Sequence, residues 1–371
     1  MLKWTLQRIF QHYPPEQYGL RLPLEQHKAL AAIRDCRTAV MGSHSEYCQQ
    51  GHLCGVFYNS CRHRGCPQCQ HVKREQWLVQ WTARLLNTQH HHWIFTCPHE
   101  LLPLWRYNRA WFQDCLYTSV SKTLKQLSAA PKHLGAQPGY LLALHTWSRK
   151  LSEHPHIHAL ISHGGLTASG DWCLPRRKSL FPAEVVKQLF RGKFLAAVKL
   201  AMVQGLLSFP PDKTAVYWQT MVNKLGRVKW QIYACKPYEH AHGVAKYLAK
   251  YMRGGALRNS QIINVKNGQV HLKYHSHQSK KTERIKYEIK AFEHQMLQHM
   301  PLAGKLSIRY YGLYQPTLLK RLNQARQQLG QAAYVAVEVP DWQEVLTRLG
   351  ASLVCPSCGS KLLKSGTAAR H

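Results

Sequence analysis

Two histidines lie two positions apart in the alternating segment 154–162, where His156 and His158 are separated by an apolar residue. On a strand, residues two apart share a face, so both imidazoles would point the same way and could hold a divalent cation. His145 lies eleven residues before His156, and a tight turn near Leu151 would bring it opposite the pair. The pattern predicts a catalytic metal site of three histidines that polarises a phosphate, although His-x-His also arises by chance in a chain with 24 histidines.

Two tyrosines, Tyr247 and Tyr251, lie four residues apart in the segment 241–253, which has helical spacing. Residues four apart share a helix face, so both phenols would project together, with Lys246 and Lys250 beside them. A phenolate can attack phosphorus and form a covalent phosphotyrosine, and nearby cations favour the phenolate. Viewed alone, such a pair is more often core packing or base stacking, so the hypothesis depends on the histidines.

Five cysteines fall within 22 positions near the amino terminus, and we expect a structural zinc site there. Cys66-Pro-Gln-Cys69 is typical of a zinc knuckle. Cys48 with either Cys54 or His52 could complete the site, and Cys61 is a further candidate. The full set of expected zinc ligands is Cys48, Cys54, Cys61, Cys66 and Cys69.

A second cysteine pair, Cys355 and Cys358, lies close to the carboxyl terminus. Because one pair cannot fill a tetrahedral zinc site, it would need His371, another domain or a second subunit to bind a metal.

The chain has 371 residues with 50 Lys and Arg against 18 Asp and Glu, a formal net charge of +32. The positive side chains of such a surface repel one another unless a bound polyanion neutralises them, so nucleic acid is the expected partner. We find no basic amphipathic helix, lipidation signal, secretory pattern or membrane span, and we expect a cytoplasmic protein without membrane contact. The basic side chains expected to bind DNA are Arg62, Arg64, Lys73, Arg74, Lys246, Lys250 and Arg253.

Strands are expected at 92–97, 140–147, 156–162 and 228–235, with a hairpin over 262–274 whose tip is Asn267-Gly268. Helices are expected over 24–37, 72–86, 105–127, 181–205 and 241–253. Strands separated by helices and partly joined as hairpins indicate an α+β core with an antiparallel sheet. We expect a zinc-binding module at 1–85, a catalytic domain at 86–275, and a helical basic region at 276–371.

The order of these motifs resembles the HUH endonucleases, and within them the bacterial two-tyrosine rolling-circle insertion-sequence transposases. The resemblance rests on the histidine and tyrosine motifs together with the segments 59–70, 95–101, 144–147, 309–313 and 355–359. It implies that His156 and His158 bind Mg²⁺ or Mn²⁺, that His145 is the third ligand, and that both tyrosines are nucleophiles. It also implies a ferredoxin-like antiparallel catalytic sheet. The chain departs from the family at 48–51, where a Cys-x-x-Cys pair is usual.

The resemblance implies a transposase that nicks single-stranded DNA, forms a 5′-phosphotyrosine and leaves a 3′-OH that primes replication. Its partners would be transposon ends, target DNA and the host replication machinery. A plasmid replication initiator or a relaxase would use the same chemistry. Two further alternatives are a non-catalytic zinc-finger regulator and a metal-dependent hydrolase that releases free phosphate ends.

Overall fold

The computed structural model describes residues 3–19, 22–177, 179–240, 243, 255–276, 279–348, 350 and 352–367. The segment that carries the two tyrosines falls outside the described residues, and with it Tyr247, Tyr251, Lys246, Lys250 and Arg253.

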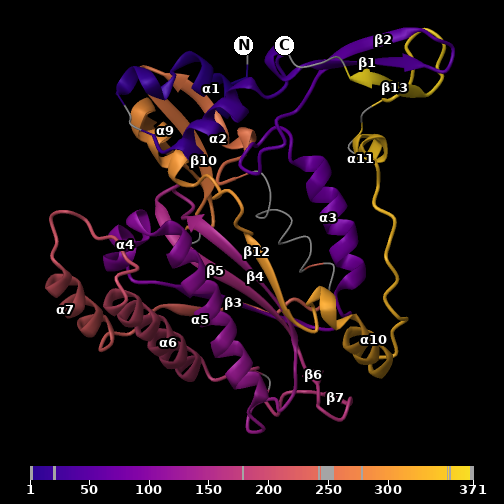
Figure 1. Ribbon diagram of the computed structural model, residues 1–371. Helices are drawn as coiled ribbons and strands as arrows, with labels where there is room; N and C mark the ends of the chain where they lie inside the picture. The colour runs from indigo at the N-terminus through magenta and orange to yellow at the C-terminus, as the bar shows by residue number, and fades with distance from the viewer. Residues whose placement is uncertain are drawn as a thin grey trace.

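A five-stranded sheet forms the centre of the molecule, and every neighbouring pair of its strands is antiparallel (Figure 1). Its order is β12 (Ile308–Gly312), β4 (Gly139–Trp147), β5 (Glu153–Ser162), β3 (His90–Thr96) and β8 (Ile232–Ala234). Helices accompany this sheet on both sides, so the expected α+β class with an antiparallel sheet is confirmed.

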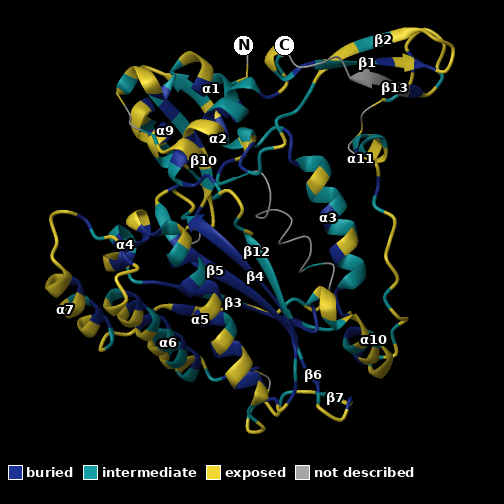
Figure 2. Ribbon diagram, viewed as in Figure 1, coloured by how far each residue is buried: buried dark blue, intermediate teal, exposed yellow. Residues whose placement is uncertain are grey.

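One face of the sheet is mainly apolar and lies under four helices (Figures 1 and 2). Phe95, Leu142 and Ile157 are fully buried on this face, as expected for strands whose alternate residues are hydrophobic. The covering helices are α4 (Leu102–Tyr107), α5 (Arg109–Ala129), α6 (Ala183–Val203) and α7 (Ala215–Leu225).

The opposite face is covered by α3 (His71–Arg84) and α10 (Leu319–Gln328). Trp81 stacks on Tyr310 of β12 with ring centroids 3.7 Å apart, and Trp77 Nε1 donates to the Tyr310 hydroxyl at 2.9 Å. These aromatic contacts hold α3 against the edge strand, and the histidines lie on the same face of the sheet.

A second apolar core joins the amino-terminal helices to a late part of the chain. Here α1 (Leu6–His12) and α2 (Leu24–Asp35) pack with α9 (Ile289–Gln298) and with a three-stranded sheet (Figure 1). That sheet contains β9 (Ile262–Lys266), β10 (Gln269–His275) and β11 (Thr282–Glu288). Asn267 and Gly268 join β9 to β10 with φ of 52° and 70°, the backbone that an Asn-Gly hairpin turn requires.

A third sheet has the order β13-β1-β2 and joins the two ends of the chain. It is built from β1 (Ser43–Cys48), β2 (Leu53–Tyr58) and β13 (Leu362–Thr367), with α11 (Trp342–Arg348) before it. The region 276–371, expected to be helical, contains helices and also the strands β11, β12 and β13. The remaining elements are β6 (Gly165–Leu166), β7 (Trp172–Cys173), η1 (Pro15–Tyr18), η2 (Ala39–Met41), η3 (His99–Leu101), η4 (Asn259–Gln261) and η5 (Pro316–Leu318).

Two expected elements differ in extent from those observed. The helix expected over 105–127 is divided at Asn108, whose side-chain amide donates to the Leu104 and Ser208 carbonyls at 3.0 and 2.7 Å. The strand expected over 228–235 is shorter and pairs with β3 only from Ile232.

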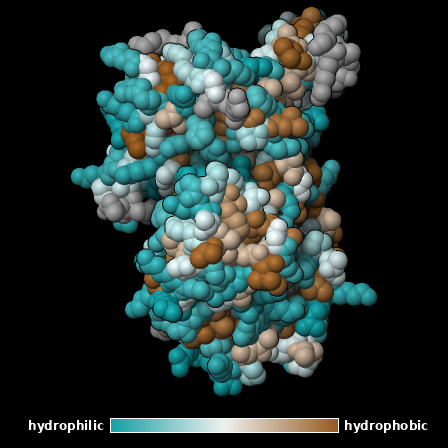
Figure 3. Space-filling view, turned by 60° about the vertical axis from the view of Figure 1, so that its left-hand side comes forward, coloured by the Kyte–Doolittle hydropathy of each residue, from teal (hydrophilic) through white to brown (hydrophobic). Residues whose placement is uncertain are grey.

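The face of the molecule seen in Figure 3 is mainly hydrophilic, with hydrophobic side chains among the hydrophilic ones. Within the described ranges, no helix combines the length and the apolar character that crossing a bilayer requires.

Glu293 is a carboxyl group inside the second core, fully buried on α9. Neither of its oxygens has a hydrogen-bond partner within the described part of the chain. Burial first, and then the negative charge of Glu16, raise the pKa of Glu293 to about 8 from a usual value near 4.5. Glu293 is therefore mostly protonated in the folded protein at neutral pH.

This carboxyl group gives the first prediction. Between pH 4.5 and 8 the unfolded chain releases the Glu293 proton while the folded chain keeps it, so stability falls as pH rises and levels off above pH 8. Relative to the wild type, Glu293→Gln should be more stable at pH 8 by roughly 2–4 kcal/mol, and this gain should shrink at pH 5. Urea unfolding at both pH values measures this difference in the free energy of unfolding. The control is Glu25→Gln, at an exposed position. A gain in stability of the same size at pH 5 and at pH 8 would contradict the raised pKa of Glu293.

Candidate active site and metal centres

The three histidines of the predicted catalytic site lie on adjacent strands of the central sheet. His145 of β4 pairs directly with His156 of β5, and His158 lies two residues further along the same face. The connection between these strands is a tight turn in which Leu151 has φ of 59° and its amide donates to the Ser148 carbonyl at 3.0 Å. The turn is therefore where the sequence predicts it.

The imidazoles converge closely enough to share one ion. One nitrogen from each of the three rings lies within 4.8 Å of the other two. Nε2 of His156 and Nε2 of His158 are 3.0 Å apart, and the ring centroids of His145 and His158 are separated by 4.3 Å. Three nitrogen ligands gathered from one side suit a divalent ion and leave its remaining coordination positions open.

Hydrogen bonds to the other ring nitrogens orient two of these ligands. Nδ1–H of His156 donates to the His154 carbonyl at 2.5 Å, so its Nε2 lone pair is available to a cation. Nδ1 of His158 lies 2.8 Å from Nε2 of His92, on β3. When a cation occupies Nε2 of His158, the Nδ1–H of that ring donates to His92.

His92 was missed as a functional residue by the sequence analysis, which treated it only as the start of a strand. The signal was the run His90-His91-His92 at the head of an apolar strand. Register explains its contact, because Leu160 pairs with His92 and places it one step beyond His158 on the same face.

All of these imidazoles are neutral at physiological pH. Burial, as the largest cause, lowers the pKa of His156 to about 3 and that of His92 to about 4. Burial followed by the neighbouring imidazoles lowers the pKa of His145 and of His158 well below the usual 6.5. Neutral imidazoles are the form that binds a metal, so the donor set fits a divalent cation.

The histidines line a cavity of about 920 Å³ between the central sheet and α3. Its basic side chains are Arg74, Arg149, Lys236 and Arg258. Its aromatic side chains are Trp147, Tyr233, Tyr238 and Tyr274. Positive charge and exposed rings around a metal site are features that bind the phosphates and bases of a nucleic-acid strand.

Described residues on both sides of the tyrosine segment also line this cavity. Lys236, Pro237 and Tyr238 lie before it in the chain, and Gly255 and Ala256 lie after it. The described residues that line the cavity on either side of the tyrosine segment are therefore Tyr238 and Gly255.

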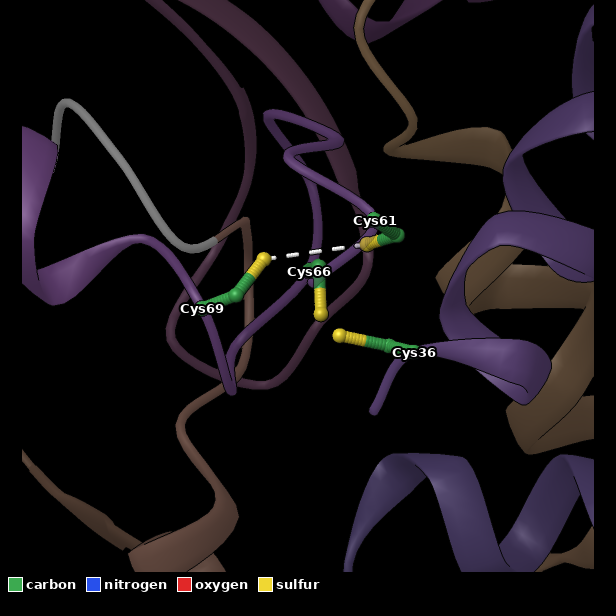
Figure 4. Close-up of side chains that lie close together, drawn as sticks. All are labelled: Cys36, Cys61, Cys66 and Cys69. Atoms are coloured by element: carbon green, nitrogen blue, oxygen red, sulfur yellow. Dashed lines mark hydrogen bonds between the residues drawn. The ribbon is translucent and has the colours of Figure 1, made fainter. Parts of the chain in front are cut away.

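Four cysteines form a separate cluster between the amino-terminal helices and α3. Figure 4 shows the thiols of Cys36, Cys61, Cys66 and Cys69 turned toward one another, with the Cys61 and Cys69 sulfurs 3.7 Å apart. Hydrogen bonds from the thiols of Cys36, Cys61 and Cys66 lower the pKa of Cys69. Four sulfurs at this spacing match the edges of a tetrahedral zinc site.

This grouping differs from the ligand set expected from the sequence. Cys36 takes a place in the cluster, although it lies 25 residues before Cys61, at the end of α2. Cys48 lies instead in the β13-β1-β2 sheet, and the thiol of Cys54 donates to the His52 carbonyl there at 3.3 Å. Cys36 was missed because its separation from the other cysteines matches no short zinc motif.

The basic residues expected to bind DNA are used in different ways. Arg62 and Lys73 are exposed, and Arg74 lines the cavity. Arg64 instead donates to the carbonyls of Leu302 and Lys305, at 2.6 Å for Lys305, and so links the cysteine cluster to the loop after α9.

Two family models match separate parts of the chain. The model described as "Transposase zinc-binding domain" matches residues 5–97, which contain Cys36 and the cysteines near it. The model described as "Putative transposase" matches residues 139–321, which contain the three histidines and both tyrosines.

Two curated relatives are similar over most of the chain. A putative transposase of Sinorhizobium fredii is 31% identical over 352 residues, covering 91% of this chain and 88% of the relative. The transposase of insertion sequence IS801 from Pseudomonas savastanoi pv. phaseolicola is 27% identical over 287 residues, covering 75% of this chain and 67% of the relative.

Among solved structures, the conjugative relaxase TrwC in complex with oriT DNA matches with a TM-score of 0.23 and 11% identity, covering 67% of this chain and 95% of that chain. The extent of the match to the Sinorhizobium fredii relative, together with both family models, shows that this chain belongs to the insertion-sequence transposases that carry an amino-terminal transposase zinc-binding domain.

Proposed function

We propose that this transposase nicks and joins single-stranded DNA through 5′-phosphotyrosine intermediates formed by Tyr247 and Tyr251. The observation that carries the proposal is the set of neutral imidazoles of His145, His156 and His158 in the wall of a basic cavity. The described residues that flank the tyrosine segment, Tyr238 before it and Gly255 after it, line this same cavity.

The histidines would hold Mg²⁺ or Mn²⁺, which when bound supplies Lewis-acid polarisation of a phosphate oxygen. His92 and the His154 carbonyl keep the rings of His158 and His156 in the tautomer and orientation that present Nε2. Arg74, Arg149 and Arg258 would hold neighbouring phosphates of the strand by charge, and the cavity aromatics would stack with its bases.

The proposed step is a transfer in which the number of phosphate ester bonds is conserved. The phenol oxygen of one tyrosine loses its proton and forms a bond to phosphorus, while the bond from phosphorus to the 3′-oxygen breaks. The departing oxygen takes up a proton and becomes a free 3′-OH. The reverse attack by a 3′-OH rejoins DNA and restores the phenol, so strand transfer needs no ATP.

Two tyrosines would allow one chain to hold a transposon end and a target end. The released 3′-OH would serve the host replication machinery as a primer while the displaced strand leaves, which is rolling-circle transposition. A plasmid replication initiator or relaxase would use the same chemistry at an origin, so substrate choice separates these functions. Oligonucleotides from the ends of the element should be cleaved in preference to origin sequences.

The second prediction tests the nucleophiles. Incubation with a single-stranded oligonucleotide from the element's end and Mn²⁺ should give an SDS-resistant adduct that carries a 3′ label. A 5′ label should instead appear on a shorter strand that a polymerase can extend. The double variant Tyr247→Phe, Tyr251→Phe should lose the adduct, because only the phenol oxygen is removed. Tyr107→Phe, an exposed tyrosine at the end of α4, is the control and should retain it.

The other functions give other outcomes in this experiment. Cleavage without an adduct would indicate a metal-dependent hydrolase. Binding without cleavage would indicate a zinc-finger regulator. Either result with the wild-type protein would overturn the proposal.

The third prediction concerns the metal ligands. His156→Ala and His158→Ala should each reduce adduct formation by on the order of 10²-fold or more, because the developing charge on the phosphate loses its stabilisation. DNA affinity should change little, since it depends mainly on phosphate contacts. The affinity for Mn²⁺, measured by electron paramagnetic resonance, should fall in both variants. It should be unchanged in His294→Ala, a control at an exposed histidine of α9. Unchanged Mn²⁺ binding in the ligand variants would contradict the site.

The fourth prediction concerns His92 as a positioning residue. His92→Ala should weaken Mn²⁺ binding about 10- to 100-fold, because His158 loses the partner that orients its ring. His92→Gln, which can still accept a hydrogen bond, should recover part of the lost Mn²⁺ affinity. If His92 had only a structural role, Gln would not restore that affinity. Equal Mn²⁺ affinity in the wild type and the Ala variant would exclude this role.

A further inference from the structure

A third group of metal-ligating side chains is separate from the histidine site and from the cluster of Cys36, Cys61, Cys66 and Cys69. It brings Cys48 and His52, at the turn between β1 and β2, together with Cys355 and Cys358, which follow α11. These residues are separated by some 300 positions in the chain, and the pairing of β13 with β1 brings them together. Cys355 and Cys358 lie outside the residues that match the zinc-binding domain model.

The spacing of the donor atoms agrees with a tetrahedral zinc site. The sulfurs of Cys48 and Cys358 are 3.6 Å apart, and Nδ1 of His52 lies 3.4 Å from Cys48 and 3.8 Å from Cys355. Zinc bonds of about 2.3 Å to sulfur and about 2.0 Å to nitrogen give tetrahedron edges of about 3.8 Å and about 3.5 Å. A sulfur separation of 3.6 Å is also far longer than a disulfide bond of about 2.05 Å.

The backbone around these cysteines has the form of zinc knuckles. The Ser357 amide donates to Cys355 Sγ at 3.4 Å, and the His52 amide donates to Cys48 Sγ at 3.3 Å. Gly359 closes the turn after Cys355-Pro-Ser-Cys358 with φ of 72°, and its amide donates to the Cys355 carbonyl at 2.9 Å. Amides that face sulfur stabilise thiolates, the form that binds metal.

The sheet around this group has almost no hydrophobic core to hold it together. Among the side chains that the structure describes there, the buried cluster consists of Cys48, Cys355 and Leu362, with Cys54 packed against it. The large apolar side chains of β2 face solvent instead: Leu53, Val56, Phe57 and Tyr58. A unit this small needs a metal or a disulfide for stability, and its cysteines are free.

We propose that Cys48, His52, Cys355 and Cys358 bind a second structural zinc ion that fastens the carboxyl-terminal segment to the β1–β2 hairpin. The pair Cys355 and Cys358, which cannot fill a zinc site alone, thus finds its partners within the same chain. Cys54 packs against this group and its thiol donates to the His52 carbonyl at 3.3 Å, but it is not among the four residues whose ligand atoms lie within 4.8 Å of one another. The site is structural because all four positions are filled by protein, so no coordination position remains for substrate.

The fifth prediction is a metal count on the full-length protein purified under reducing conditions. Elemental analysis should find two zinc ions per chain, one for each cysteine cluster, and no stoichiometric iron. The double variant Cys355→Ser, Cys358→Ser should retain one zinc ion and become more sensitive to proteolysis after α10. Cys173→Ser, outside both clusters, is the matched control and should retain two.

Single variants test the ligand set itself. His52→Ala should lose the second zinc ion or bind it more weakly, whereas Cys54→Ser should still bind it. The reverse result would overturn the assignment of His52 as the fourth ligand. One zinc ion in the wild type, unchanged in the double variant, would overturn the site. So would a Cys48–Cys358 disulfide found by mass spectrometry, or bound iron. Each readout is independent of DNA cleavage, so failure here is distinguishable from failure of the proposed function.

Discussion

Successive side chains of a strand point to opposite faces of its sheet, and β5 uses the two faces for different purposes. Ile157 and its apolar neighbours face the helices α4 to α7, while His156 and His158 face the cavity. The burial of one face fixes the register, because a slip of one residue would place the imidazoles in the apolar core. Burial of the other face keeps the imidazoles of His156 and His158 neutral, so one face of the strand supplies stability and the other supplies metal ligands.

The features that depend on local pattern could be predicted from the sequence. Alternation predicted the histidine strand and its orientation, and Asn267-Gly268 predicted the β9–β10 turn, because both signals act over a few residues. The turn near Leu151 followed from the same local reasoning, and with it the pairing of His145 with His156. Within the described part of the chain, most strand and helix limits lie close to those expected, but Asn108 divides the helix expected over 105–127, and the strand expected over 228–235 begins only at Ile232.

The features that depend on contacts between distant segments could not be predicted in this way. Cys36 joins Cys61 only because α2 packs on the second core, and Cys48 meets Cys358 only because β13 pairs with β1. Spacing rules for zinc motifs treat nearby cysteines as one set, so they grouped Cys48 with Cys61, Cys66 and Cys69, whereas the structure groups it with His52, Cys355 and Cys358. The sequence was similarly ambiguous about which basic side chains are free to bind DNA. Arg64 and the exposed Arg62 are alike in sequence, but the guanidinium of Arg64 serves backbone carbonyls.

The pairing of β13 with β1 has a consequence for the order in which the chain can fold. During synthesis, β1 and β2 leave the ribosome long before β13, the strand that completes their sheet. Until β13 has been made, one edge of β1 presents unpaired amides and carbonyls beside the exposed apolar side chains of β2. A nascent chain, or one that ends before residue 362, therefore exposes a strand edge that can pair with other chains and aggregate.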